Sequence, residues 1–169
     1  MHKLFQKRRS HRQFTDEEVT DDQIQAILAA AMTSPCAVHI KTWEFIVVKD
    51  KEMIAKLGKV GQFQAFIRNA PCSIVIASEE NNWWVENASI VAGYIYLEAT
   101  NQGLGTCWAN IRDGSLLAGK GKEKKVKELL CIPSKYRVLC IMPIGNPSKE
   151  LPEHDEKSFS KKKVHLEKW

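Results

Sequence analysis

The feature that most restricts the fold is the stretch from Trp83 to Trp108, which is typical of one long helix closed by a glycine-bracketed turn. Apolar residues leave almost no polar face between Asn87 and Glu98. A helix that is apolar nearly all round has to be covered on every side, by its own domain or by a partner subunit. The stretch has fewer uninterrupted apolar residues than the roughly twenty that a membrane span needs. We therefore expect a central core helix and no membrane partner.

Two glycines mark the end of this helix. Gly103 fits the position just past the last helical turn, where a left-handed backbone costs least in glycine. Gly105 lets the chain turn at once into a strand-like run over residues 106–111. We therefore expect a strand directly after the core helix.

The rest of the chain alternates between helix and strand signals. Thr20-Asp21-Asp22-Gln23 has the form of a capping box, and apolar residues follow at helical spacing until Ser34-Pro35 stops the helix. The predicted helices are 1–6, 20–34, 50–58, 83–103 and 120–130, and the predicted strands are 43–48, 72–77, 106–111 and 136–144. Strands separated by helices indicate a mixed α/β or α+β layer fold, with helices packed on a sheet.

Length and cysteine usage limit the class of protein. A chain of 169 residues is the size of one domain, so we expect a single domain over 1–169. Its five widely spaced cysteines are an odd number, which argues against a zinc site or a disulfide framework and for a reducing compartment. No apolar segment follows the early charges, so no secretory signal is visible and a cytoplasmic protein is expected.

The basic balance of the chain has two interpretations. A formal charge of +5 fits a nucleic-acid or phosphate partner, but the lysine runs at 120–127 and 161–163 supply eight of the basic residues. A charge run is usually a solvated face. We therefore expect no nucleic-acid partner, and a non-enzymatic basic binding module is kept as an alternative.

One basic cluster is better placed for a ligand. Lys7-Arg8-Arg9-Ser10-His11-Arg12 holds four cations and a hydroxyl within six residues. Guanidinium groups bind phosphate bidentately, and the serine adds a neutral donor. No Gly-rich dinucleotide fingerprint is present, since Gly103-Leu104-Gly105 follows a helix instead of a strand. No metal motif or nucleophile pair is recognisable, and Cys36 is expected to be a semi-buried structural residue.

Several common motifs occur in a specific order. They are Arg8-Arg9-Ser10-His11-Arg12 with Phe14, Ser34-Pro35-Cys36-Ala37, Trp43–Val48, Ala70-Pro71, Asn87-Ala88-Ser89-Ile90, Gly103-Leu104-Gly105-Thr106-Cys107-Trp108, Ile144-Gly145-Asn146-Pro147, and Val164-His165-Leu166-Glu167-Lys168-Trp169. In this order, over essentially the whole chain, they closely resemble the FMN-dependent nitroreductase family. The resemblance implies a three-layer α+β fold, with a central mixed or antiparallel sheet between helices. It also implies a homodimer built around the long core helix.

The resemblance further implies two FMN molecules at the dimer interface, each contacted by both chains. Arg8, Arg9 and Ser10 would belong to the phosphate and ribityl end. Lys157 of the tail would reach the same phosphate, with Lys161–Lys163 as the alternatives. Arg12 would lie at the pyrimidine edge of the flavin. A cation there stabilises the negative charge that a reduced flavin gathers near N1 and O2.

Two further segments complete the implied site. The first is the loop that the partner subunit lays against the flavin ring: Pro35, Cys36, Ala37 and His39. The second is the stretch whose backbone amides face flavin N5 and O4: Trp108, Ala109 and Asn110. The C-terminal tail over 146–169 would extend onto the partner subunit.

The function that the resemblance implies is that of an NAD(P)H oxidoreductase with NADH or NADPH as the electron donor. A reduced nicotinamide delivers hydride to FMN, and a small-molecule acceptor then takes two electrons at the same place, so ping-pong kinetics are expected. Nitroaromatics and quinones are plausible acceptors. No side chain is assigned as catalytic, and no metal is expected. Relatives with other flavin chemistry, reductive dehalogenation or flavin fragmentation, are the alternative.

The chain departs from the usual loop of this family. Cys36 and His39 stand where a serine and an asparagine are usual, and Lys41-Thr42 replaces a Gln-Pro pair. Lys41 is expected to add a positive charge near a pocket that is usually neutral, which favours an anionic substrate. Two glycine-containing segments, 58–68 and 113–122, are predicted to be either mobile covers of the ring or ordinary surface loops.

Overall fold

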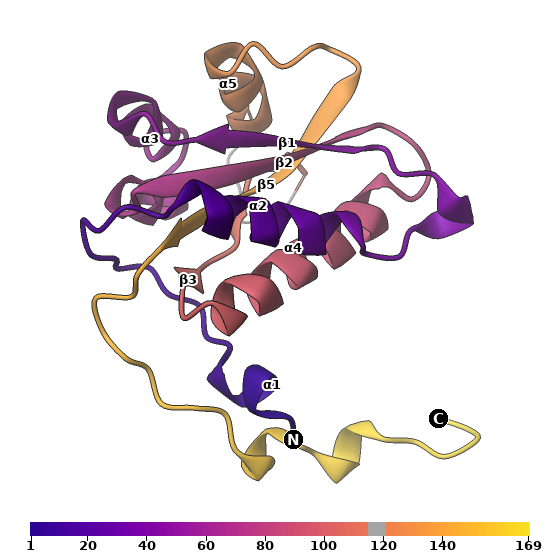
Figure 1. Ribbon diagram of the computed structural model, residues 1–169. Helices are drawn as coiled ribbons and strands as arrows, with labels where there is room; N and C mark the ends of the chain where they lie inside the picture. The colour runs from indigo at the N-terminus through magenta and orange to yellow at the C-terminus, as the bar shows by residue number, and fades with distance from the viewer. Residues whose placement is uncertain (115–120) are drawn as a thin grey trace.

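The computed structural model describes residues 1–114 and 121–169, and its centre is a β-sheet (Figure 1). Its five strands are β1 (Trp43–Val48), β2 (Cys72–Glu79), β3 (Gly105–Thr106), β4 (Ala109–Asn110) and β5 (Tyr136–Gly145). The order across the sheet is β1-β2-β5-β3, and β4 also pairs with β5. These strands pair antiparallel throughout, as the resemblance implied.

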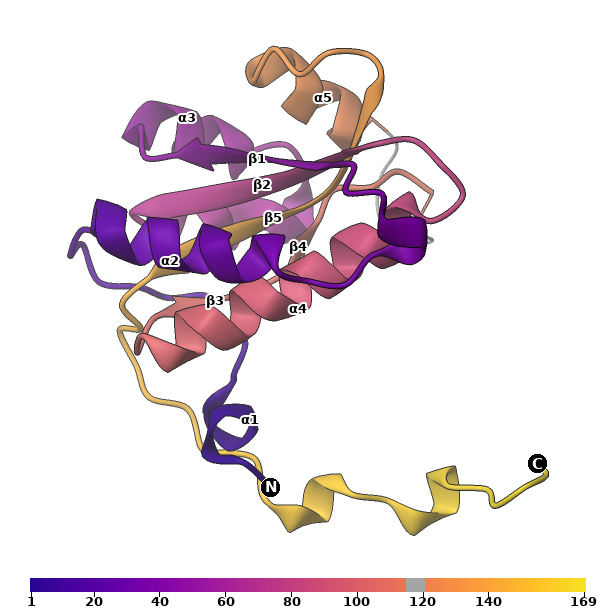
Figure 2. The ribbon, with the colours of Figure 1, turned by 45° about the vertical axis from the view of Figure 1, so that its right-hand side comes forward.

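Helices cover both faces of the sheet. Figures 1 and 2 show α2 and α4 on one face, and α3 and α5 on the other. The α-helices are α1 (Lys3–Lys7), α2 (Asp21–Met32), α3 (Lys51–Leu57), α4 (Trp84–Asn101) and α5 (Lys122–Leu129), and the 3-10 segments are η1 (Ala37–His39), η2 (Gln62–Asn69), η3 (Glu156–Ser158) and η4 (Lys161–Lys163). The expected capping box at Thr20 and Gln23 is present at the start of α2. The three-layer α+β prediction is thus confirmed.

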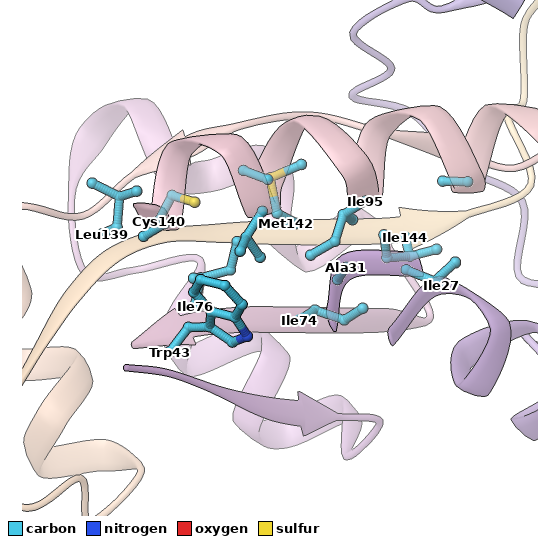
Figure 3. Close-up of a cluster of buried hydrophobic side chains, with 14 of the residues drawn as sticks. Ile27, Ala31, Trp43, Ile74, Ile76, Ile95, Leu139, Cys140, Met142 and Ile144 are labelled. Atoms are coloured by element: carbon cyan, nitrogen blue, oxygen red, sulfur yellow. The ribbon is translucent and has the colours of Figure 1, made fainter. Parts of the chain in front are cut away.

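The strand β2 joins the two halves of the hydrophobic core. Successive side chains of a strand point to opposite faces of a sheet. Ile74 and Ile76 therefore belong to the cluster under α2 and α4, and Val75 to the cluster under α3, η2 and α5. Figure 3 shows Ile27 of α2 and Ile95 of α4 in the first of these clusters. A strand buried on both faces explains the continuous apolar run of this segment.

The long helix α4 is the core helix that the sequence predicts, and its end is as expected. Gly103 has a φ of +76°, and the N–H of Leu104 returns to the carbonyl of Ala99. One side of α4 is not covered by this chain, because Ile90 is 39 % exposed and Gly93 is also exposed. In the described ranges, no helix is both long and apolar enough to cross a bilayer.

The single strand predicted over 106–111 is wrong, because the structure has two short strands there. β3 and β4 share one register on β5, with Thr106 opposite Ile144 and Ala109 opposite Ile141. In that register Cys107 faces Pro143, which has no N–H to donate to a ladder. The ladder is therefore interrupted between the two strands, and the backbone there is free to bond elsewhere.

Two expectations about surface segments also need correction. The helix predicted at 120–130 is present as α5, but Lys122 on it is only 5 % exposed instead of solvated. Most of the predicted cover at 58–68 is η2, which buries Gln64 and Ile67 and so packs as part of the body. Of the second predicted cover, 113–122, residues 115–120 lie outside the described residues.

The chain after β5 leaves the body of the molecule. In Figures 1 and 2 it passes α1 and ends away from the sheet and the large helices. The N–H of His154 donates to the carbonyl of Gln6 at 2.8 Å, which fixes the start of this tail to α1. Beyond it, apolar side chains are exposed at Val164, Leu166 and Trp169.

Candidate functional site

The basic N-terminal cluster lies against β3, next to the C-terminal end of α4. Ser10 forms a parallel bridge with Thr106, and the N–H of His11 donates to the Thr106 carbonyl at 3.0 Å. A Cβ on Gly105 would lie 2.8 Å from the Cβ of His11. The close approach of the two segments therefore requires glycine at this position. Gly105 thus fixes the place of the cluster as well as the turn.

Tyr96 of α4 connects the cluster to the segment after β3. Its hydroxyl accepts the backbone N–H of Trp108 at 2.7 Å and lies 3.3 Å from the Oγ of Ser10. The guanidinium of Arg8 lies over its ring, 5.5 Å from the centroid. Burial raises the pKa of Tyr96, so the phenol is protonated at neutral pH.

Sequence reasoning missed Tyr96 because it counted the residue as part of an apolar helix face. A signal was available, since a tyrosine hydroxyl that is buried with its ring usually finds a hydrogen-bond partner. The sequence alone does not show where that partner lies. Tyr96 has two partners, Ser10, which lies 86 positions earlier, and Trp108, which lies 12 positions later.

Arg8 and Arg9 are half-buried cations without an anionic partner in the described parts of the chain. Arg8 Nη2 lies 2.9 Å from His154 Nε2, and Arg9 donates to the carbonyl of Pro152. Burial lowers the pKa of His11, and electrostatic repulsion from Arg9 and Arg8 lowers it further. The cluster is therefore an electropositive surface that an anion would stabilise.

Arg12 is exposed, and its contacts differ from those of Arg8. Its guanidinium is over the ring of Phe66 in η2, 5.7 Å from the centroid, and its carbonyl accepts from Asn69 at 3.2 Å. The Cys107 thiol lies near Arg12 and the Tyr96 hydroxyl, and burial raises its pKa. A buried neutral thiol is a poor nucleophile, so Cys107 has a packing role here.

The backbone amides at 108–110 differ in what they bond. The N–H of Trp108 goes to Tyr96, and Ala109 pairs with Ile141. The N–H of Ile111 donates to Leu139, and bonded and non-bonded pairs alternate in an antiparallel ladder. The pair of Asn110 with Cys140 is therefore a non-bonded one, in which the Asn110 backbone faces away from β5. The amides of Trp108 and Asn110 thus both point away from β5, and that of Trp108 is already bonded to Tyr96.

The carbonyl of Asn110 accepts two hydrogen bonds from side chains outside β5. It accepts from Gln64 Nε2 at 3.0 Å and from Lys122 Nζ at 2.8 Å. Burial lowers the pKa of Lys122, and Asp113 opposes that shift. These two bonds explain why Lys122 is buried and fix the orientation of the Asn110 peptide groups.

The loop predicted to contact the ring lies at the other end of α4. The N–H of Ala37 donates to the buried Oδ1 of Asn87 at 2.9 Å. Asn87 precedes Tyr96 by nine positions, or roughly 14 Å along a helix axis. Figure 2 shows the turn of η1 beside one end of α4 and β3 beside the other. Pro35 and His39 are exposed, Cys36 and Ala37 half-buried, so within one chain this loop does not join the basic cluster.

Two remaining predicted positions have simple contacts. Lys157 is an exposed residue of η3, and its backbone N–H donates to Asp155 at 3.0 Å. Its role at a phosphate stays a prediction. Lys41 donates from Nζ to the carbonyl of Met32 at the end of α2, at 2.9 Å. This contact gives Lys41 a helix-capping role that the sequence interpretation did not include.

Comparison with known proteins gives this chain a family. A protein-family model described as the nitroreductase family matches residues 5–62 and 58–146. A protein of Methanothermobacter thermautotrophicus, provisionally named NADH dehydrogenase/NAD(P)H nitroreductase, is 32 % identical over 96 % of this chain and 84 % of its own length. The chain therefore belongs to the nitroreductase family, which confirms the resemblance seen in its motifs.

A solved structure agrees in fold over the full length. The FMN-dependent nitroreductase of Clostridium difficile superposes with a TM-score of 0.93 at 38 % identity, covering 98 % of each chain. More distant similarity reaches human iodotyrosine deiodinase 1, at 24 % identity over 92 % of this chain and 64 % of the relative.

Proposed function

We propose that this chain is an FMN-dependent oxidoreductase that takes electrons from NADH or NADPH and passes them to a small-molecule acceptor. The observation that carries the proposal is the half-buried cluster of Arg8, Arg9 and Ser10 without a carboxylate partner among the described residues. FMN has a dianionic phosphate, which such donors suit. The FMN-dependent relative from Clostridium difficile supports the same assignment.

The residues present fit FMN at both of its ends. Arg8, Arg9 and Ser10 would hold the phosphate and ribityl chain, with Lys157 as a further cation. Arg12, on the other side of the cluster, would lie at the pyrimidine edge. The Asn110 amide, directed off the sheet, would face flavin N5 and O4, while Trp108 and Ala109 line that stretch without free amides.

The second half of the site would come from a partner subunit. In a homodimer, a two-fold axis across the middle of α4 reverses the helix, so the partner's N-terminal end lies beside this chain's C-terminal end. That operation brings the loop of Pro35, Cys36, Ala37 and His39 from one copy to the basic cluster of the other. The uncovered face at Ile90 and Gly93 supports such a dimer. The tail over 146–169, with exposed apolar side chains at Val164, Leu166 and Trp169, would extend onto the partner.

The protein's part in the reaction is to bind, orient and tune. Bound FMN supplies two-electron chemistry, by accepting hydride from a nicotinamide and reducing an acceptor. Arg12 stabilises negative charge at the pyrimidine edge, and the Asn110 amide offers a hydrogen bond fixed by Gln64 and Lys122. No side chain is needed as a general acid or base. The five free thiols support a reducing, cytoplasmic setting.

Purified protein, reconstituted with FMN and passed through a desalting column, tests the proposal. We expect a flavin absorption spectrum near one FMN per chain, and NADH or NADPH consumption with nitrofurazone or menadione that follows ping-pong kinetics. A protein that retains no flavin after reconstitution would falsify the proposal. Salt-sensitive binding to nucleic acid by such a protein would then favour the basic binding module.

Reductive dehalogenation is a second candidate, and the distant similarity to iodotyrosine deiodinase is the observation that favours it. The two functions share the FMN site and differ in the acceptor. Halide release from a halotyrosine by the reduced protein, together with no turnover of nitrofurazone or menadione, would select this candidate over the first.

A further inference from the structure

The direction of one hydrogen bond at Tyr96 is fixed by chemistry. A backbone N–H can only donate, so the Tyr96 oxygen is the acceptor in its 2.7 Å contact with Trp108. The phenolic proton of Tyr96 is then available for another acceptor. The Oγ of Ser10, 3.3 Å away, is the oxygen within reach among the described residues. The Cys107 sulfur beside them is a weaker acceptor.

A serine that accepts this proton keeps its own proton for a third group. The sequence of donors then runs from the Trp108 amide through Tyr96 to Ser10, and ends in an O–H that is free to turn toward a ligand. Linked hydrogen bonds of this kind polarise one another in the same direction. An anion at the basic cluster is the acceptor that such a terminal O–H suits.

We propose that Tyr96 is a positioning residue that makes Ser10 a hydrogen-bond donor to the phosphate of the bound flavin nucleotide. The inference rests on the proposed function, because it needs FMN at the basic cluster. Tyr96 acts on two phosphate contacts at once, since its ring also carries the guanidinium of Arg8 at 5.5 Å. Removing only the hydroxyl separates these two effects.

The ligand pair FMN and riboflavin isolates the phosphate. Both carry the same ring and ribityl chain, so the ratio of their dissociation constants reports the phosphate contacts alone. The test variants are Tyr96→Phe, which keeps the ring under Arg8, and Ser10→Ala. The matched control is Tyr94→Phe, because Tyr94 lies on the same helix and is half-buried, and its hydroxyl makes no hydrogen bond to the described residues. Flavin fluorescence quenching by the full-length protein gives each constant.

We expect Tyr96→Phe to weaken FMN binding by about fivefold to tenfold, the effect of one hydrogen bond to a charged group transmitted through a neighbour. Riboflavin binding should change little, so the FMN preference falls by the same factor. Tyr94→Phe should keep the preference of the wild type. The double variant Ser10→Ala/Tyr96→Phe should match Ser10→Ala alone, because the two residues act in one chain of bonds.

The possible failures are distinguishable. Equal weakening of FMN and riboflavin in Tyr96→Phe, or full additivity in the double variant, overturns the positioning role and leaves the proposed function intact. An unchanged FMN preference in Tyr96→Phe does the same. A wild-type protein that binds neither flavin overturns the proposed function and this inference together. Circular dichroism and a melting curve for each variant show that the comparison is made between folded proteins.

Discussion

Two arginines lie over aromatic rings at the two ends of α4, and they differ in what neutralises them. Arg137 lies over Trp84 at the N-terminal end, 5.0 Å from the ring centroid, and Arg8 over Tyr96 near the C-terminal end, at 5.5 Å. Arg137 binds Glu123 through two nitrogens, at 2.7 and 3.0 Å, and also pairs with Glu80. Arg8 has His154 and, in the described chain, no carboxylate.

The difference separates a structural arginine from one that we propose binds a ligand. Arg137 is neutralised by the fold, so its removal should affect folding. Arg8 is also half-buried and has a similar stacking partner, but we propose that its charge is balanced by a bound anion. Among the described residues no carboxylate neutralises Arg8, and this difference, more than the arginine itself, is why we propose the C-terminal end of α4 as the ligand site. Five expected outcomes test this comparison, in addition to the Tyr96 experiment above.

The largest expected effect comes from Glu123 at the structural end. Its side chain is 7 % exposed and also accepts the N–H of Val138 at 3.0 Å. Glu123→Ala should lower the free energy of unfolding by about 3 kcal/mol, since it leaves Arg137 with Glu80 alone and an amide unpaired. Urea denaturation measures this loss, and FMN affinity measured on the folded fraction should stay as in the wild type.

Low pH should remove the contribution that Glu123 makes to the free energy of unfolding. Burial alone would raise the pKa of Glu123, but the bonds from Arg137 and Val138 outweigh it and hold the pKa below its usual range. A carboxylate whose pKa is lower in the folded state adds stability above its unfolded pKa of about 4.3, and this stability is lost as pH falls through the folded value. Glu123→Gln should therefore show a smaller acid-side loss of stability than the wild type. Parallel acid-side curves would contradict this assignment.

Arg8 should show the opposite pattern to Glu123. Arg8→Ala should weaken FMN binding by about 50-fold, the cost of losing a charge-assisted phosphate contact. The free energy of unfolding without FMN should change by less than about 1 kcal/mol, since the lost stacking is partly exposed. Equilibrium dialysis against FMN and urea denaturation measure the two quantities. A large loss of stability with unchanged FMN affinity would make Arg8 a second structural arginine.

Local signals in the sequence predict most of the fold correctly. The capping box at Thr20, the Asp50 cap of α3 and the left-handed Gly103 each depend on residues within one helical turn. The split of the strand at 106–111 depends instead on Pro143, more than thirty positions away, which faces Cys107 only once the register of β5 is set. Such a pairing has no signal in either segment alone.

The candidate site divides in the same way. The motif at Arg8 to Arg12 carries its chemistry in its own residues, so the basic cluster could be predicted, although its role toward a flavin stays a prediction. The contribution of Tyr96 could not be predicted, because one hydroxyl on an apolar helix does not reveal that Trp108 and Ser10 meet there. Lys122 likewise belongs to a lysine-rich surface helix until the fold brings Asn110 to it.

Arg12→Ala should have a smaller effect, and it should act on the midpoint potential of the flavin instead of on phosphate binding. Arg12→Ala removes a cation from the proposed pyrimidine edge, which should destabilise the reduced flavin and lower its midpoint potential by about 30 mV, or ~1.4 kcal/mol for two electrons. Spectroelectrochemical titration measures the potential. Phe66→Leu is the matched control, because it removes the ring under Arg12 and keeps the charge. A potential and a cofactor affinity unchanged in Arg12→Ala would place Arg12 away from the flavin.

The smallest expected effect is on the pKa of His11, which reports directly on uncompensated positive charge nearby. Burial lowers its pKa first, and Arg9 and Arg8 lower it further by repulsion. Folding therefore favours the neutral ring. The stability that this gives is present above the unfolded pKa of about 6.5 and is lost as pH falls through the folded value. A phosphate between the two arginines would cancel their repulsion, so FMN binding should raise the His11 pKa.

Proton NMR titration of the His11 ring measures that pKa with and without FMN. Arg8→Ala should raise it in the free protein and reduce the further rise on adding FMN, because one source of repulsion is already gone. Riboflavin, which lacks the phosphate, should leave the pKa nearly where it is in the free protein. An FMN-bound His11 with an unchanged or lower pKa would mean that the phosphate lies elsewhere. The C-terminal end of α4 would then carry an unbalanced charge for a reason other than the cofactor.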